Sequence, residues 1–215
     1  MNFPLSSGGF GRFPNSGELV AWLHAADTGG MKKAEQENPT IILATAGLEL
    51  RFPRLGDQHG FAVWLHSELV LETKTSAETI AWPESPPLQQ LHEQLLPTGA
   101  AVLGVGSAGT THWSASFSVR EPGLVWCEYA ARVSQPWQPA SEWLGTRLHL
   151  GPGWTAERSE QGLLLHGKDR LLKLALLGPE SSLETIGVGE FELRPAEAFP
   201  RRTKTIEWKV ALLGK

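Results

Sequence analysis

The stretch Thr111–Val133, THWSASFSVREPGLVWCEYAARV, carries the strongest structural signal in this chain. Apolar and polar residues alternate on both sides of a Glu-Pro-Gly turn. The alternate positions that share the apolar face are Thr111, Trp113, Ala115, Phe117 and Val119, followed by Val125, Cys127, Tyr129, Ala131 and Val133. A period of two is typical of a strand with one buried face. The stretch therefore predicts an antiparallel β-hairpin that contributes one face to a hydrophobic core.

Outward from this hairpin, short runs of β-favouring residues recur about every ten positions, separated by turns rich in glycine and proline. The runs are 41–46, 48–52, 61–65, 69–73, 100–103, 144–150, 163–166, 171–177, 191–193 and 206–213. This spacing favours an all-β protein, an antiparallel β-sandwich of roughly a dozen strands. We expect a single domain over residues 1–215, with residues 1–12 as an N-terminal arm.

Two segments carry helical signals instead. Residues 86–96 place three leucines at helical spacing behind a Ser85 cap, and two prolines occupy the expected first turn. The segment from Ser16 to the glycine pair at 29–30 is compatible with either a short helix or a strand. The sequence therefore predicts a β-sandwich with one or two short helices, the clearer one over residues 86–96.

The composition excludes several classes of protein. The 215-residue chain has a net charge of −4 and a pI near 6.0, which argues against a protein that follows nucleic-acid phosphates. No apolar run approaches the ~18 residues of a membrane span, and a single cysteine excludes a disulfide framework. The charge and the short apolar runs therefore predict no nucleic-acid and no membrane partner. Because the N-terminus shows no signal peptide and lone Cys127 fits a reducing compartment, we expect a cytoplasmic protein.

Three motifs that suggest catalysis have simpler interpretations. Residues 104–109, GVGSAG, match the dinucleotide fingerprint G-x-G-x-x-G, but the residues that follow alternate as a strand, whereas the fingerprint needs a helix there. We therefore expect a glycine-rich turn. Ser107 lacks the first glycine of a nucleophile elbow, and Cys127 lies on an apolar face, where a thiol is usually buried and unreactive. No cofactor and no catalytic residue is predicted.

His112, Glu128 and His149 occupy the polar faces of their strands and form a candidate metal-ligand set. The register of the predicted hairpin argues against it. With the Glu-Pro-Gly turn as the loop, His112 pairs with Arg132 and Glu128 pairs with Ser116, about 13 Å apart along the sheet. We therefore predict no metal site.

Nine tryptophans accompany a single tyrosine in this chain. Trp113 and Trp208 fall on apolar faces and are expected in the core, whereas two other tryptophans fall on polar faces. Outward indoles beside planar charged groups are typical of surfaces that stack sugar rings. The predicted ligand-binding residues are Trp126, Trp143, Glu128, Arg132, Arg147 and His149. The alternative is that a second sheet buries these faces and that the tryptophans simply build the core.

Four segments occur in an order that characterises a known domain: Phe13–Gly17 (FPNSG), residues 56–72, the strands from His112 to Val133, and residues 147–152 (RLHLGP). Together they resemble the C-terminal β-sandwich domain of heparinase II/III-like polysaccharide lyases, over about residues 13–213. The resemblance implies a supersandwich-like fold and a role connected with carbohydrates.

The departures from that family concern catalysis. In the family, the sandwich supplies a histidine to the active site and can hold zinc through two histidines and an aspartate, and here only His59 and Glu72 match those positions. The family's catalytic tyrosine lies on a helical toroid that has no counterpart in this sequence. We therefore expect a non-catalytic carbohydrate-associated module. It would bind a poly- or oligosaccharide, or dock onto a protein partner that carries the helical catalytic domain.

Two alternatives stay open from the sequence. A small enzyme of lyase or epimerase type would use His59, His112 or His149 as a base with a nearby carboxylate, in a concave pocket. A purely structural or interaction protein would bury its tryptophans in the core. The placement of these histidines and indoles distinguishes the three functions.

Overall fold

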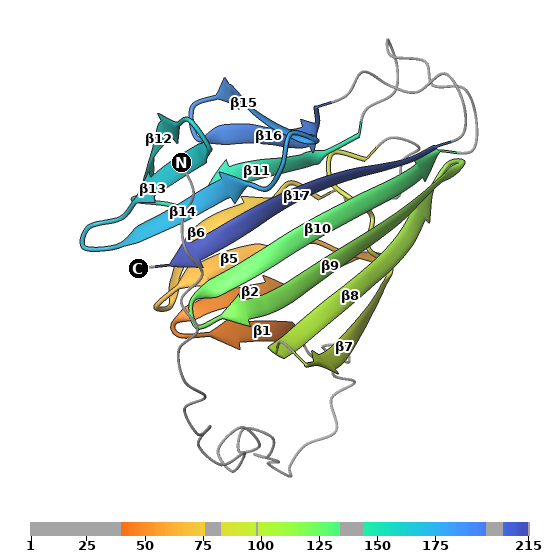
Figure 1. The fold of residues 1–215 in the computed structure, drawn as a ribbon, viewed down its shortest axis with the longest axis horizontal. Helices are drawn as coiled ribbons and strands as arrows, with labels where there is room; N and C mark the ends of the chain where they lie inside the picture. The colour runs from red at the N-terminus through yellow and green to blue at the C-terminus, as the bar shows by residue number, and fades with distance from the viewer. Residues whose placement is uncertain (1–39, 76–82, 98, 134–143, 197–203, 215) are drawn as a thin grey trace, which may run out of the picture. The chain divides into compact units, whose positions relative to one another are not determined.

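The structure, a computed structural model, describes residues 40–75, 83–97, 99–133, 144–196 and 204–214. These residues form β-strands and connecting turns, arranged in two large antiparallel sheets and one small one (Figure 1). They belong to one compact unit, Asn38–Lys215. The predicted N-terminal arm and the segment from Ser16 to residue 30 lie outside the described residues. Within the described ranges, no helix is long and apolar enough to cross a membrane.

The described strands form two large sheets whose neighbours pair antiparallel. The seven-stranded sheet has the order β1 (Ile41–Thr45), β2 (Leu48–Phe52), β5 (Ala62–Leu65), β6 (Glu68–Thr73), β11 (Thr146–Leu150), β16 (Glu190–Pro195) and β15 (Ser181–Gly187). The eight-stranded sheet has the order β12 (Thr155–Ser159), β13 (Gly162–His166), β14 (Leu171–Leu176), β17 (Lys204–Gly214), β10 (Leu124–Val133), β9 (Thr111–Glu121), β8 (Gly99–Ala108) and β7 (Gln90–Leu96). The small sheet pairs β3 (Arg54–Leu55) with β4 (Gln58–His59). Each run predicted as a strand overlaps one of these elements.

The hairpin of β9 and β10 has the predicted register. Glu128 pairs with Ser116, and Arg132 pairs with His112. A β-bulge beside the turn makes Arg120 the extra residue of β9. The alternate positions predicted to face the core are buried, apart from a partly exposed valine near the turn. The local pattern therefore predicted both the pairing and the buried face of this hairpin.

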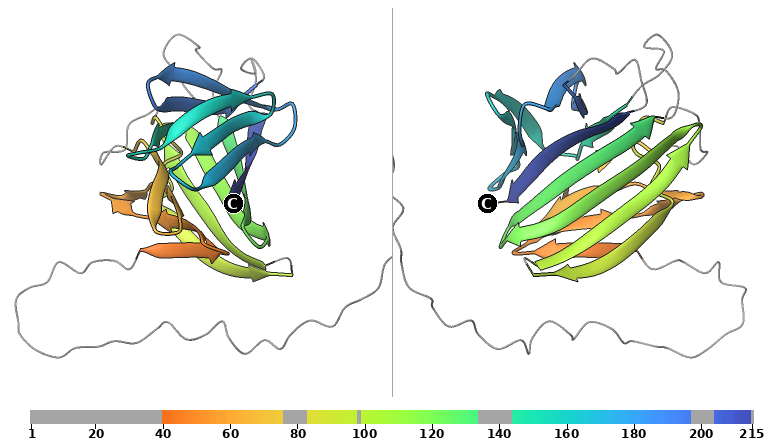
Figure 2. Two further views of the ribbon diagram at one scale, coloured as in Figure 1. Left: turned by 90° about the vertical axis from the view of Figure 1, so that its left-hand side faces the viewer. Right: turned by 45° about the vertical axis from the view of Figure 1, so that its right-hand side comes forward.

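The two large sheets pack face to face, and their inner side chains form one hydrophobic core (Figure 2). Phe117 of β9 joins the layers, because its ring centroid lies 4.9 Å from that of Phe52 in β2 and 5.4 Å from that of Phe61. Trp113 and Trp208 are buried, and their rings meet edge to face at 6.1 Å. The prediction that both tryptophans belong to the core is confirmed. The fold is an all-β, antiparallel sandwich.

The helix predicted over residues 86–96 is wrong. Strand β7 occupies most of this segment and pairs along β8 at the edge of the eight-stranded sheet. The leucines at helical spacing do not share one environment, since Leu88 is buried whereas Leu95 is 83% exposed. The free edge of β8 offers backbone pairing to all of β7, and this tertiary contact outweighs the local helical preference.

The glycine-rich turn predicted at residues 104–109 is also placed differently. Strand β8 continues through its first glycines to Ala108, and only Gly109 lies in the turn, with φ of +56°. A Cβ atom at Gly106 would stand 1.7 Å from the carbonyl oxygen of Pro87. Glycine is required there because another backbone segment crosses β8 at contact distance. A strand at this position offers no helix N-terminus to a dinucleotide.

Candidate functional site

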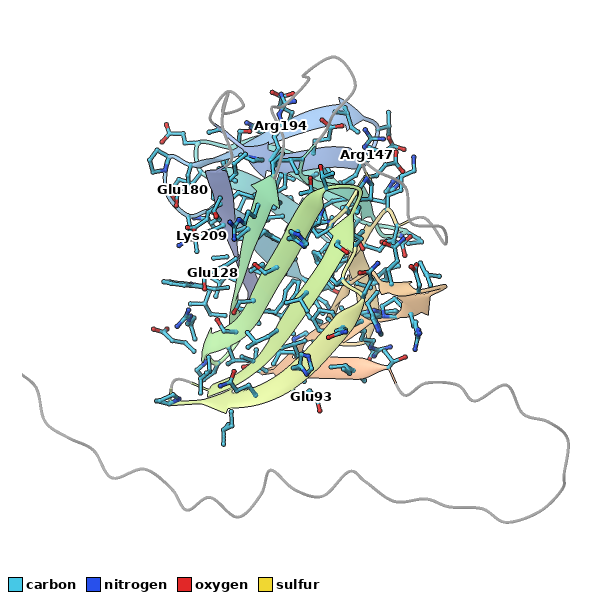
Figure 3. All side chains as sticks on the ribbon, turned by 90° about the vertical axis from the view of Figure 1, so that its right-hand side faces the viewer. Glu93, Glu128, Arg147, Glu180, Arg194 and Lys209 are labelled. Atoms are coloured by element: carbon cyan, nitrogen blue, oxygen red, sulfur yellow. The ribbon has the colours of Figure 1, made fainter. Side chains whose placement is uncertain are left out.

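The six predicted ligand-binding residues do not form one site. Three lie on the outer face of β10 in the eight-stranded sheet: Trp126, Glu128 and Arg132. Two lie on the outer face of β11 in the seven-stranded sheet: Arg147 and His149. Trp143 lies outside the described residues. Because the outer faces of two packed sheets point in opposite directions, the predicted platform divides into two groups, as the positions of Glu128 and Arg147 in Figure 3 illustrate.

Glu128 holds together a charged cluster on the outer face of the eight-stranded sheet. One of its carboxylate oxygens lies 3.3 Å from a guanidinium nitrogen of Arg120, and the other lies 3.4 Å from Nζ of Lys209. The Arg120 guanidinium also lies over the indole of Trp126, 4.5 Å from the ring centroid. This cation–π contact covers one face of the half-buried indole. Trp126 is therefore part of a charged cluster rather than an open stacking surface.

A depression of about 380 Å³ lies beside this cluster on the same face. Its floor consists of small side chains: Ser114, Ser116 and Ala130. Leu103 and Val105 of β8 line one side. The opposite side is charged, with Glu128, Glu207 and Lys209. The depression thus offers hydroxyl, carboxylate and ammonium groups against an apolar wall. Figure 3 shows Glu128 and Lys209 close together on this face.

The sequence pattern did not reveal Arg120, Glu207 and Lys209 as members of this surface. The alternation of β17 places Glu207 and Lys209 opposite the buried Trp208, but it does not show that β17 pairs with β10. That pairing joins strands far apart in the chain. Arg120 enters the cluster through the β-bulge, which a period-two pattern does not predict. Arg132, which the pattern did predict, is exposed on the same face.

Arg147, on the other sheet, is engaged by carboxylates of the protein itself. Its guanidinium donates hydrogen bonds to Glu84 and to Glu192, the latter at 2.8 Å. The Glu192 side chain is only 11% exposed, and its carboxylate also lies 3.9 Å from Arg194. Removing one partner of such a network would leave a largely buried charge without its counter-ion. Arg147 therefore pairs with carboxylates at the seven-stranded sheet and is not free to bind a ligand in this arrangement.

His149 lies between Glu72 of β6 and Glu190 of β16 on the same outer face. Its Nδ1 atom is 3.7 Å from a carboxylate oxygen of Glu190. Its Nε2 atom is buried and has no hydrogen-bond partner among the residues that the structure describes. A general base must present a ring nitrogen to its substrate. With one nitrogen facing a carboxylate and the other buried, His149 is poorly placed for that role.

The other two candidate histidines belong to different sheets. His59 lies in the small sheet, where burial lowers its pKa. The contact of its Nδ1 atom with the Phe52 carbonyl at 3.4 Å raises the pKa, and the charge of Arg54 lowers it, so that the net shift is downward. His112 is exposed on the outer face of β9. Across the described ranges, no group of three or more His, Cys, Asp or Glu side chains is placed to hold a metal ion. The histidines therefore do not assemble one catalytic centre.

The reactivity of the Cys127 thiol reports whether the inner face of β10 is buried. Its thiol is fully buried, and this burial, together with the negative charge of Glu128, raises the pKa well above its usual range. Because the thiolate is the reactive form, we expect no labelling by iodoacetamide in buffer and complete labelling in denaturant, measured by mass spectrometry. Cys127→Ser provides the blank. Rapid labelling of the folded protein would show that this face of β10 is accessible.

The two positions that match the zinc set of the heparinase-like sandwich do not come together in one sheet. His59 lies in β4 of the small sheet, and Glu72 lies in β6 of the seven-stranded sheet. Neither belongs to the depression on the eight-stranded sheet. No protein-family model matches the chain, and no curated protein is similar enough in sequence to count as a match.

Proposed function

We propose that the protein is a non-catalytic, carbohydrate-associated β-sandwich module that binds a glycan on the outer face of its eight-stranded sheet. The observation that carries this proposal is one shallow depression with hydroxyl, carboxylate and ammonium groups around it. Sugar hydroxyls both donate and accept hydrogen bonds, and these three groups supply matching acceptors and donors. Leu103 and Val105 provide the apolar contact that a sugar ring also requires.

The floor of the depression suits a ring that lies flat on the sheet. Ser114 and Ser116 are alternate residues of β9, so their hydroxyls emerge on the same face about 7 Å apart. The neighbouring floor residue, Ala130, is equally small. A ligand can therefore approach the strands closely, while the larger side chains of β8 and β17 limit it on two sides.

Trp126 has an indirect role in this proposal. Its indole makes a cation–π contact with the guanidinium of Arg120, and Arg120 forms an ion pair with Glu128 at the edge of the depression. The indole thus helps to hold the carboxylate toward the ligand. Trp126 is a positioning residue, and Glu128 and Lys209 are the charged groups that touch the glycan.

The order of segments that resembles the heparinase II/III-like sandwich supports a carbohydrate context. In that family the sandwich accompanies a helical catalytic domain, so the proposal includes docking onto a separate partner of that kind. The depression lies on the eight-stranded sheet, which leaves the outer face of the seven-stranded sheet to contact such a partner.

A glycan array followed by calorimetric titration tests the proposal. Ser114→Trp would fill the floor of the depression from an exposed position, and we expect it to weaken binding of the selected glycan at least about tenfold by steric exclusion. Ala44→Trp makes the same kind of change at an exposed position on β1, in the other sheet, and should leave the affinity within about twofold.

Two results would overturn the proposed function. One is an array and titrations in which no poly- or oligosaccharide binds the full chain. The other is a glycan whose affinity falls equally with Ser114→Trp and Ala44→Trp, because the ligand would then bind elsewhere.

A further inference from the structure

A second and larger hollow lies far from the charged cluster in the strand order of the eight-stranded sheet. It is a groove of about 920 Å³ at the end of the sandwich where β12 and β15, the last strands of their sheets, come together (Figure 1). It is lined by Leu150, Gly151, Trp154, Thr155, Ala156, Arg158, Leu163, Thr185, Ile186, Gly187, Val188, Gly189 and Phe191. We call it the interlayer groove.

The interlayer groove continues the hydrophobic core to the surface. Leu163 and Phe191 belong to the core cluster and also line the groove. At its mouth Ile186 is 41% exposed and Val188 is fully exposed. Water therefore contacts apolar side chains that would be more stable if covered. An apolar ligand in this groove would cover them and extend the packing between the sheets.

The charge of the groove restricts the ligand. Among the described residues that form the lining, Arg158 is the one ionisable side chain, and none is a carboxylate. One guanidinium nitrogen of Arg158 donates a hydrogen bond to the carbonyl oxygen of Leu183 at 2.5 Å, which links β12 to β15 across the two sheets. This bond fixes the side chain and leaves further N–H groups of the guanidinium to bind a ligand. A guanidinium group of this kind pairs well with a carboxylate.

We propose that the interlayer groove binds a long-chain carboxylate, such as a fatty acid. The alkyl chain would lie against Trp154, Ile186 and Phe191, and the carboxylate would pair with Arg158. The volume falls in the range of ordinary small-molecule sites, about 300–1,000 Å³. Because the site lies apart from the depression on the outer face, this ligand is independent of the proposed glycan.

The experiment compares dodecanoate with its uncharged methyl ester, each titrated calorimetrically against the full chain below its micelle concentration. We expect one dodecanoate per chain and at least about tenfold weaker binding of the ester, because the ester cannot form the charge-assisted hydrogen bond. Decanoate should bind more weakly than dodecanoate, by about fourfold for each methylene removed.

Variants separate the head group from the chain. Arg158→Gln should abolish the difference between acid and ester while the ester still binds, which also shows that the groove is intact. Val188→Asp places a carboxylate at the exposed mouth and should weaken dodecanoate more than the ester. Arg132→Gln, on the outer face of β10, removes the same type of charge elsewhere and should change neither.

The proposal is overturned if dodecanoate does not bind, if it binds without saturating at one molecule per chain, or if acid and ester bind equally. Equal effects of Arg158→Gln and Arg132→Gln would also overturn it. Binding of dodecanoate by Ser114→Trp is expected to match that of the unaltered chain, so loss of the glycan site and loss of the fatty-acid site can be told apart. Capture of an extended peptide with no response to dodecanoate would show an edge-strand docking site instead.

Discussion

Phe117→Ala is expected to lower the free energy of unfolding by about 4 kcal/mol. The Phe117 side chain is fully buried, and it contacts aromatic rings of both layers: Phe52, Phe61 and Tyr129. Alanine would leave a cavity where the two sheets meet, and the surrounding strands are too well paired to close it. Urea denaturation followed by tryptophan fluorescence measures the change.

Leu95→Ala is the matched control for this substitution. Leu95 lies in the edge strand β7 and is 83% exposed, so its truncation should change the free energy of unfolding by no more than about 0.5 kcal/mol. If Phe117→Ala were as mild as Leu95→Ala, the two large sheets would not share the core described above.

Gly106→Ala is expected to destabilise the protein by about 3 kcal/mol or more, because the added methyl group cannot be accommodated without moving the backbone. Its Cβ would stand 1.7 Å from the carbonyl oxygen of Pro87, and this backbone carbonyl cannot rotate away as a flexible side chain would. The nearby hydrogen bond from the amide of Gln89 to the carbonyl of Val105, at 2.9 Å, holds the two segments together. Thermal and urea unfolding of the purified variant measure the loss.

Gly153→Ala separates steric overlap from backbone strain. Gly153 has a φ of +78°, and a methyl group added to it would meet no atom within 4 Å beyond its chain neighbours. Alanine there meets only the cost of a left-handed conformation, about 1 kcal/mol. A Gly106→Ala variant that lost no more stability than Gly153→Ala would mean that the segment at Pro87 does not cross β8 at contact distance.

The hairpin of β9 and β10 shows what local sequence can predict. Its alternation indicated which side chains are buried, and the three-residue loop expected at residues 121–123 placed Glu128 opposite Ser116. The structure reaches the same register through a two-residue turn, Pro122–Gly123, and the bulge at Arg120. Both properties depend on residues close in the chain, because the pleat gives a period of two and a short loop allows one register. Cys127 and Trp113 were placed in the core on the same basis.

Residues 86–96 show where the same kind of argument fails. Their leucines fit a helix as well as a strand, and nothing local distinguishes the two. The choice depends on the edge of β8, to which β7 adds as a neighbour. The glycines of β8 were assigned to a turn for a related reason, since the sequence does not show that Pro87 lies against Gly106.

In the candidate site, too, the local sequence predicted the directions of side chains but not the partners of strands. The outward direction of Trp126, Glu128, Arg147 and His149 was predicted from strand parity, but the sheet to which each strand belongs was not. Lys209 reaches Glu128 through the pairing between β10 and β17, two strands that are far apart in the sequence. Side-chain patterns specify faces, whereas the choice of strand partners rests on the sum of many contacts.

By itself the sequence determined that this protein is built from short antiparallel strands, where most of them lie and which side chains they bury. Those properties follow from local alternation and turn chemistry. Only the tertiary structure decided which strands share a sheet, that Arg147 and His149 lie on the other sheet from Trp126, Glu128 and Arg132, and that an apolar groove opens between β12 and β15. Backbone hydrogen bonds between strands are nearly independent of side-chain identity, so strand partners are selected by packing across the whole core.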